Sequence, residues 1–172
     1  MSHHTRTRLT LARSLAACIA VAVIGGCTSA DSTTGLGTPK LTVATDTVQG
    51  TGQLAELQQR RAAWVARGIT DYRVQLQKSC FCGGDITRPV LVEVRGGAVS
   101  KVWDLETTKR VADISLYPTI TGLFDAAIAK RSAGGNVTVA YDAALGTPVR
   151  LEIGTVANDA GVQYFLSGVL IL

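Results

Sequence analysis

The feature that most constrains this fold is a change of hydrophobic period that occurs twice along the chain. Apolar side chains recur at three- and four-residue steps over residues 53–67, as expected for an amphipathic helix. They then alternate with polar side chains over residues 72–77, as expected for a half-buried strand. The same succession returns in residues 119–131 and 137–141. This patterning predicts helices packed on an antiparallel sheet.

Turn signals complete the expected layout. Gly68 suits the residue after the first helix, Gly96-Gly97 suits a two-residue hairpin, and Thr119 suits the N-cap of the second helix. We therefore predict one α+β domain over residues 53–172, with about six antiparallel strands and two amphipathic helices on the same sheet face. The segments TRPVLVEV and GTPVRLEI match position by position. This match favours two helix-β-β-β halves, although such short matches also arise by coincidence.

The N-terminal segment is typical of a secretory signal peptide. Arg6, Arg8 and Arg13 precede an uncharged run over residues 14–30 that ends in small side chains. Its strongly apolar part, residues 15–24, is shorter than the roughly 20 apolar residues that a spanning helix needs. We expect export rather than a permanent membrane-spanning helix.

The end of that apolar run, Ile24-Gly25-Gly26-Cys27, resembles a bacterial lipobox. The resemblance implies that residues 1–26 are removed and that Cys27 becomes a lipidated N-terminus. Several acyl chains on one residue would hold the protein to a membrane, because each buried methylene contributes about 0.8 kcal/mol. Residues 27–52 are rich in Thr, Ser and Gly and are expected to form a flexible tether.

Removal of the signal peptide changes the chemistry that the chain can support. It takes away three of the 17 basic residues, which leaves 14 Lys and Arg against 13 Asp and Glu, so no nucleic-acid-binding surface is expected. Both histidines, His3 and His4, are lost as well. A chain without histidine lacks the Ser-His-Asp triad, the Cys-His pair and histidine metal ligands. We therefore expect no enzyme activity, no cofactor and no metal site.

Cys80 and Cys82 flank Phe81 in the segment SCFCGGDITR, which is expected to be a loop. In an exported protein, two neighbouring cysteines favour a disulfide, and residues two apart in an extended segment point to the same side. A redox-active pair and a soft-metal site such as one for Cu(I) remain alternatives. For Phe81 we favour a core plug over an exposed contact residue.

Three further segments have both a functional and a structural interpretation. Trp103 suits a ligand groove or sheet packing. For Tyr141-Asp142 we favour a turn that Asp142 stabilises over a catalytic role. The connection over residues 105–117 is long enough for a functional loop, but a solvated crossover explains it equally well.

The chain also resembles an uncharacterised domain-of-unknown-function family of bacterial lipoproteins over most of residues 60–155. The matching residues are Trp64, Tyr72, Cys80-Phe81-Cys82, Val92, Val94, Gly97, Thr119-Ile120, Leu123-Phe124, Val137, Val139, Tyr141-Asp142, Gly146 and Pro148. The family has no established activity, so the resemblance implies a location and a fold without a function.

We therefore expect a cell-envelope lipoprotein, held to the membrane through Cys27, that acts as a non-catalytic binding or structural module. In a source with an outer membrane, Thr28 after the lipidated cysteine favours the periplasmic side of that membrane. One alternative is an envelope thiol or soft-metal-handling protein that uses Cys80 and Cys82. A weaker alternative is an inhibitor that docks on a hydrolase.

Overall fold

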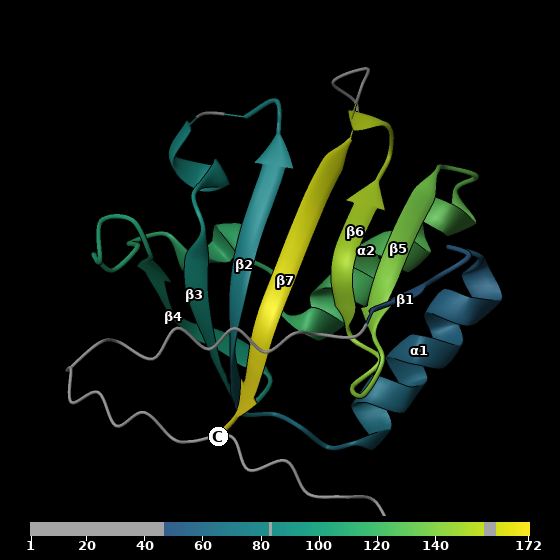
Figure 1. Ribbon diagram of the computed structural model, residues 1–172, viewed down its shortest axis with the longest axis horizontal. Coiled ribbons are helices and arrows are strands. Elements are labelled where there is room, and N and C mark those ends of the chain that lie inside the picture. The colour runs from purple at the N-terminus through teal and green to yellow at the C-terminus, as the bar shows by residue number, and fades with distance from the viewer. Residues whose placement is uncertain (1–46, 83, 157–160) are drawn as a thin grey trace, which may run out of the picture. The chain divides into compact units, whose positions relative to one another are not determined.

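The computed structural model describes residues 47–82, 84–156 and 161–172, and Figure 1 shows their arrangement. Seven strands, two α-helices and two short 3-10 helices follow one another within those residues. Their bounds are β1 Thr47–Gln49, α1 Leu54–Ala66, β2 Tyr72–Cys80, η1 Gly84–Thr87, β3 Val90–Arg95, β4 Ala98–Asp104, η2 Ile114–Leu116, α2 Ile120–Ser132, β5 Val137–Asp142, β6 Pro148–Ile153 and β7 Val162–Ile171. The predicted α+β class is confirmed.

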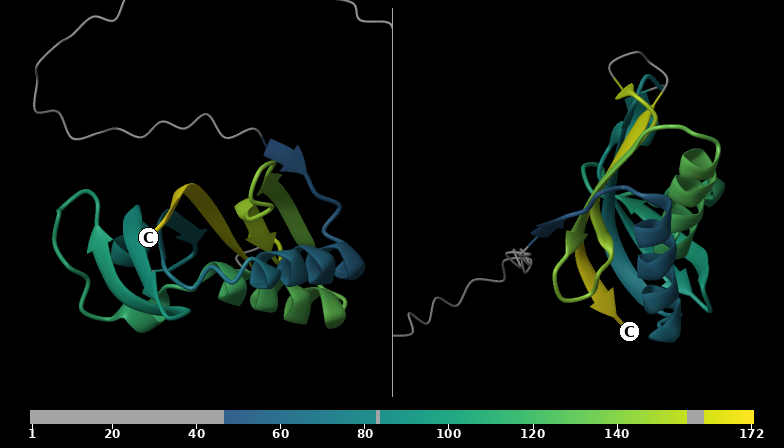
Figure 2. Two further views of the ribbon diagram at one scale, coloured as in Figure 1. Left: turned by 90° about the horizontal axis from the view of Figure 1, so that it is seen from below. Right: turned by 90° about the vertical axis from the view of Figure 1, so that its right-hand side faces the viewer.

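All seven strands form one antiparallel sheet in the order β1-β5-β6-β7-β2-β3-β4. The strands that follow α1 and those that follow α2 each form a three-stranded meander, and the two meanders meet where β7 pairs with β2. Both helices lie on the same side of the sheet (Figure 2). The opposite face is not covered by any helix that the structure describes.

The sheet has one strand more than the predicted six. The additional strand, β1, lies inside the segment 27–52 that we expected to be a tether, and it pairs with β5 at the sheet edge. Just after it, the backbone N–H of Gly50 donates to Val139 O at 2.9 Å. Three residues are too few to show a hydrophobic period, which is why the sequence did not reveal this strand. Residues 41–45, Leu-Thr-Val-Ala-Thr, could also form a short strand by their sequence, but they lie outside the described residues.

The core lies between the helices and the sheet. The alternation predicted for β2 is confirmed, because Tyr72, Val74 and Leu76 are each at most 2% exposed while the residues between them are not buried. From the helices, Leu57 and Trp64 of α1 pack against this layer. The other fully buried hydrophobic side chains of the core are Val90, Val92, Val94, Val102, Ile120, Leu123, Phe124, Ala127, Val139, Tyr141 and Leu151.

The expected turns are present. Thr119 caps α2 by accepting a hydrogen bond from the Gly122 N–H at 3.0 Å. Gly96 and Gly97 adopt φ values of 55° and 79°, the left-handed conformation that a tight hairpin requires. Gly68 donates to Val65 O after α1, also with positive φ.

The boundary of β2 differs from the prediction. We expected a loop to begin at Ser79, whereas the strand continues through Ser79 and Cys80. Pairing with β7 extends the strand, because Ser79 and Cys80 lie opposite Gln163 and Val162. Cys80 is therefore held by the sheet, and the loop starts only after it.

Candidate functional site: the Cys loop

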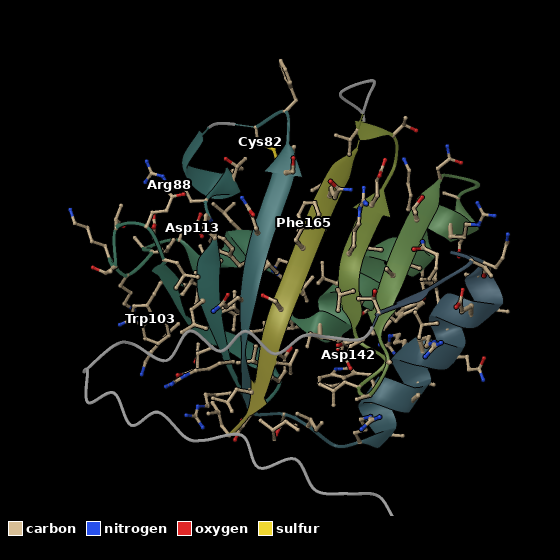
Figure 3. All side chains as sticks on the ribbon, in the orientation of Figure 1. Cys82, Arg88, Trp103, Asp113, Asp142 and Phe165 are labelled. Atoms are coloured by element: carbon tan, nitrogen blue, oxygen red, sulfur yellow. A yellow bond between two sulfur atoms is a disulfide. The ribbon has the colours of Figure 1, made fainter. Side chains whose placement is uncertain are left out.

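The Cys loop, residues 80–82, lies at one end of the sheet. Figure 3 shows Cys82 at that end and Asp142 towards the other. Cys80 is the last residue of β2, and Cys82 is the second residue after the strand. The loop is thus attached directly to a central strand of the sheet.

The sulfur atoms of Cys80 and Cys82 are in direct contact, and their Cα atoms are 5.2 Å apart. This Cα separation lies within the range of disulfide-bonded pairs. The contact brings together the two cysteines that the sequence singled out. Cys27, the predicted lipidation site, and residues 1–26 lie outside the described residues.

Phe81 is 86% exposed, so its interpretation as a core plug was wrong. The ladder between β2 and β7 ends at the pair Cys80–Val162, and Phe81 lies just beyond it. No neighbouring strand therefore covers the ring. Phe81 has the highest exposed fraction of any large apolar side chain in the described part of the chain.

A cavity of about 470 Å³ adjoins the Cys loop. Its lining residues come from β2, the Cys loop, α2, β6 and β7, namely Lys78, Cys80, Phe81, Cys82, Lys130, Ile153, Gly161, Val162 and Tyr164. Ile153 and Val162 supply an apolar part, while Lys78, Lys130 and Tyr164 supply polar groups. The cavity combines apolar surface with a small number of convergent polar groups, as ligand sites do.

The fold brings these polar groups together from distant parts of the chain. Lys78 and Tyr164 lie opposite each other on β2 and β7. Lys130 comes from the last turn of α2, and its carbon chain lies so close to Gly135 that a Cβ at position 135 would collide with it. Burial raises the pKa of Tyr164, so its hydroxyl stays protonated at neutral pH. Sequence analysis did not place Lys130 or Tyr164 near the cysteines, because no local pattern links them.

No acidic side chain lines this cavity within the described part of the chain. Among the ion pairs between described residues, none involves Lys78 or Lys130. The same residues contain no group of three or more His, Cys, Asp or Glu side chains that could hold a metal ion. The local chemistry is therefore that of two ammonium groups beside an apolar surface.

The two other aromatic candidates are not brought to this cavity. Trp103 of β4 is partly exposed and lies opposite Leu91 of β3. Leu91 is itself only partly buried, whereas Val90 and Val92 on either side of it are buried in the core. Tyr141 is fully buried, and Asp142 Oδ1 accepts hydrogen bonds from the N–H groups of Ala144 at 2.9 Å and Leu145 at 2.6 Å. The prediction that Asp142 stabilises a turn is confirmed.

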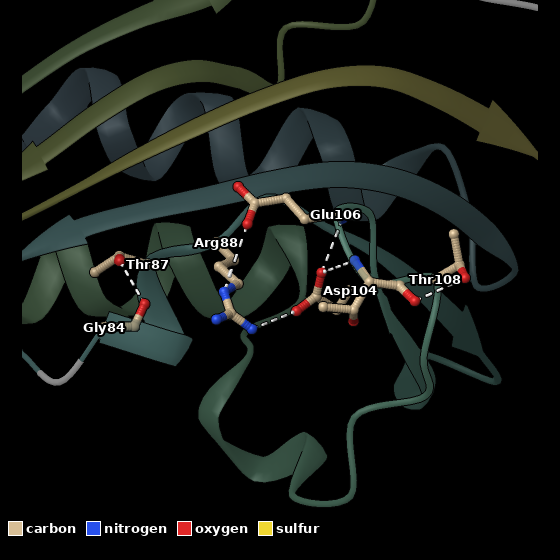
Figure 4. Close-up of polar contacts among 7 residues, drawn as sticks. Gly84, Thr87, Arg88, Asp104, Glu106 and Thr108 are labelled. Atoms are coloured by element: carbon tan, nitrogen blue, oxygen red, sulfur yellow. Dashed lines mark hydrogen bonds and ion pairs between the residues drawn. The ribbon is translucent and has the colours of Figure 1, made fainter.

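The connection after β4 is pinned by Asp104, as Figure 4 shows. Asp104 Oδ1 accepts from the N–H groups of Thr107 at 2.9 Å and Glu106 at 2.8 Å, and Oδ2 contacts Arg88 at 3.3 Å. The Thr107 N–H, followed by the other donors, holds the pKa of Asp104 below its usual range. Thr108 has a φ of 59°, which is uncommon for a residue with a side chain.

The same connection covers an edge of the sheet. The backbone of Val111 donates to Val102 O and that of Asp104 donates to Lys109 O, both at 2.9 Å. Tyr117 at its end is buried. Most of its side chains are nevertheless exposed, so the connection is a solvated crossover that also covers the edge strand β4. Such a cover prevents an edge strand from pairing with other chains.

No helix within the described ranges is long and apolar enough to span a membrane. The chain matches no curated protein and no solved structure. A family model does match residues 56–170, which include every strand and helix described above except β1, the first two residues of α1 and the last residue of β7. The chain belongs to the DUF6174 family, a family of unknown function.

Proposed function

We propose that this chain is a cell-envelope lipoprotein, held to the membrane through Cys27, and that its Cys loop forms a non-catalytic binding site. The N-terminal pattern supports export and lipidation. The single observation that carries the binding site is the 86% exposure of Phe81 beside the cavity at the Cys loop.

An exposed phenylalanine contributes little to folding, because burial is the source of its stabilising effect. Aromatic side chains are, in contrast, frequent anchors of protein interfaces, where they fill pockets of a partner. The contact between the two sulfur atoms, proposed here to be a disulfide in the cell, would limit the conformations of Phe81 before binding. A preorganised anchor loses less conformational entropy when a partner binds.

The position of the loop supports a partner located away from the anchor. The N-terminal strand enters the sheet at Thr47, which pairs with Asp142. Figure 3 shows Asp142 far from Cys82 along the sheet. The 20 residues from 27 to 46 can span at most about 70 Å when fully extended. Such a length would let the domain reach envelope components beyond the membrane surface.

Site-specific cross-linking in cells tests this proposal. A photoreactive phenylalanine analogue at position 81 should form an adduct with an envelope component. The matched control is position 65, where Val65 of α1 is 51% exposed. Adducts that are absent at position 81, or equally abundant at position 65, would contradict the binding site. Loss of fatty-acid labelling in Cys27→Ser tests the anchor separately.

A second candidate function is thiol exchange through Cys80 and Cys82. The contact between the sulfur atoms and the exposure of Cys82 favour it, as does the proximity of Lys78, which lines the same cavity. Intact-mass measurement after alkylation, with and without glutathione, distinguishes the two functions. Reduction by glutathione supports exchange, and resistance supports a structural disulfide. The weaker inhibitor hypothesis would dock one edge or face of the sheet on a hydrolase.

A further inference from the structure

We infer that the cavity beside the Cys loop binds an acidic segment of a partner protein, with carboxylates on Lys78 and Lys130 and an aliphatic side chain against Phe81. This inference rests on the proposed binding function and specifies the chemistry of its partner. It follows from the charge, the hydrogen-bonding character and the shape of the site.

The charge of the cavity comes first. Lys78 and Lys130 both line it, and no acidic side chain among the described lining residues offsets them. Both lysines are partly buried. Two partly buried lysines that line one site attract negative charge, since the interaction with a partner carboxylate is stronger there than at a fully exposed site.

The hydrogen-bonding groups point to the same ligand class. The ammonium groups of Lys78 and Lys130 donate hydrogen bonds and cannot accept them. The third polar side chain, Tyr164, keeps its proton at neutral pH and adds a hydroxyl donor. Side chains that mainly donate are complementary to a ligand that mainly accepts, and a carboxylate does so with both oxygen atoms.

The apolar part of the site is complementary to the aliphatic side chain of the proposed ligand. Ile153 and Val162 line the cavity next to the sulfur atoms of the Cys loop, and the ring of Phe81 lies at its border. An acidic residue followed by an aliphatic residue would place charge on the lysines and apolar surface on this side. Desolvation of the phenylalanine ring would supply part of the binding free energy.

The shape of the site favours a protein segment over a lipid surface. Both lysines line a wide hollow that is open to solvent, and they come from β2 and α2 rather than from the loop. A flat headgroup surface would contact exposed Phe81 first and would leave the cavity unfilled. A protruding peptide segment can contact the ring and enter the cavity together.

A peptide array tests the inference. The detergent-solubilised full chain is applied to peptides that combine Asp or Glu with Leu or Ile, each paired with its Asn or Gln counterpart. We expect binding to the acidic peptides and loss of binding to the amide forms. The double variant Lys78→Gln with Lys130→Gln should weaken binding by about tenfold or more. Lys109→Gln, an exposed lysine outside this cavity, is the matched control and should bind as the parent does.

Three outcomes would overturn the inference. Equal binding to acidic and amide peptides would exclude recognition of carboxylates. Unchanged binding by the double variant would exclude these lysines. If the protein binds phosphatidylglycerol vesicles through both lysines but binds no peptide, the site recognises a lipid surface instead.

The inference can fail while the proposed function stands. If the analogue at position 81 still forms its adduct in cells and the double lysine variant leaves the adduct yield unchanged, the Cys loop binds a partner by other chemistry. If position 81 forms no adduct, the proposed function itself fails.

Discussion

Two phenylalanines of this protein occupy opposite environments. Phe124 of α2 is fully buried and stacks with Tyr141, with ring centroids 6.4 Å apart, whereas Phe81 of the Cys loop is 86% exposed. The same side chain is therefore part of the core in one region and a surface feature in the other. The difference separates a ring that stabilises the fold by its burial from a ring that contributes little to stability.

Truncation of each phenylalanine should give the largest contrast. Phe124→Ala removes a ring from the packed core and is expected to lower the free energy of unfolding by about 3–5 kcal/mol. Phe81→Ala, the matched control, should change it by less than about 0.5 kcal/mol, because the ring has almost no neighbours. Urea unfolding followed by circular dichroism measures both. Similar losses in the two variants would contradict the structural contrast.

Two core tyrosines sharpen the comparison within the buried layer. The hydroxyl oxygen of Tyr72 accepts a hydrogen bond from the Ile120 N–H at 2.9 Å, at the start of α2. Tyr72→Phe leaves that buried N–H unpaired and should lower the free energy of unfolding by about 1–3 kcal/mol. The hydroxyl of Tyr141 is buried without a hydrogen-bond partner among the described residues. Tyr141→Phe should therefore be neutral or slightly stabilising, and a loss comparable to that of Tyr72→Phe would argue against this assignment.

The contact between Cys80 and Cys82 should contribute less to the free energy of unfolding than the core side chains do. The loop-entropy expression for a closed loop of about three residues gives at most about 1.6 kcal/mol. Cys80→Ser combined with Cys82→Ser should therefore leave the domain folded, with a modest decrease in the urea midpoint. The adduct yield at position 81 should fall more clearly, because the ring loses its fixed position. An unfolded double variant would show that the cysteines stabilise the fold itself.

Lowering the pH should produce the smallest and most gradual loss of stability. The hydrogen bond from Arg73 is the largest cause that lowers the pKa of Glu93, and backbone donation from Thr107 does the same for Asp104. A carboxyl group with a lower pKa in the folded state stabilises the fold above its unfolded pKa of about 4 and loses this contribution as pH falls through the folded pKa. Urea midpoints measured from about pH 6 down to about pH 2 should therefore decrease.

Glu93→Gln is expected to make that decrease shallower. Asp125→Asn, which removes an exposed partner of Arg61, serves as the control and should retain the full slope. Equal slopes for the parent and Glu93→Gln would show that Glu93 does not couple folding to pH.

Local patterns in the sequence predict much of the fold. The two helices, the alternation in β2, the Thr119 cap and the Gly96-Gly97 hairpin depend on neighbouring residues, so they can be inferred from neighbouring residues. The β1 strand was not predicted, because its pairing with β5 joins segments nearly one hundred residues apart and its own sequence shows no period.

The candidate site was predicted only in part. Cys80 and Cys82 are close in the chain, and their spacing alone suggested that the sulfur atoms would meet. The exposure of Phe81 could not be predicted, because it depends on where the ladder between β2 and β7 ends. The approach of Lys130 and Tyr164 to Lys78 depends on the packing of α2 and β7.

The sequence by itself therefore determined the helices, most of the strands and the neighbouring cysteines, since each follows from interactions over a few residues. Only the tertiary structure decided which aromatic ring is buried and which cations share a cavity. The physical reason is that burial and charge proximity are properties of segments brought together by the sheet, and strand order places residues side by side regardless of their distance along the chain.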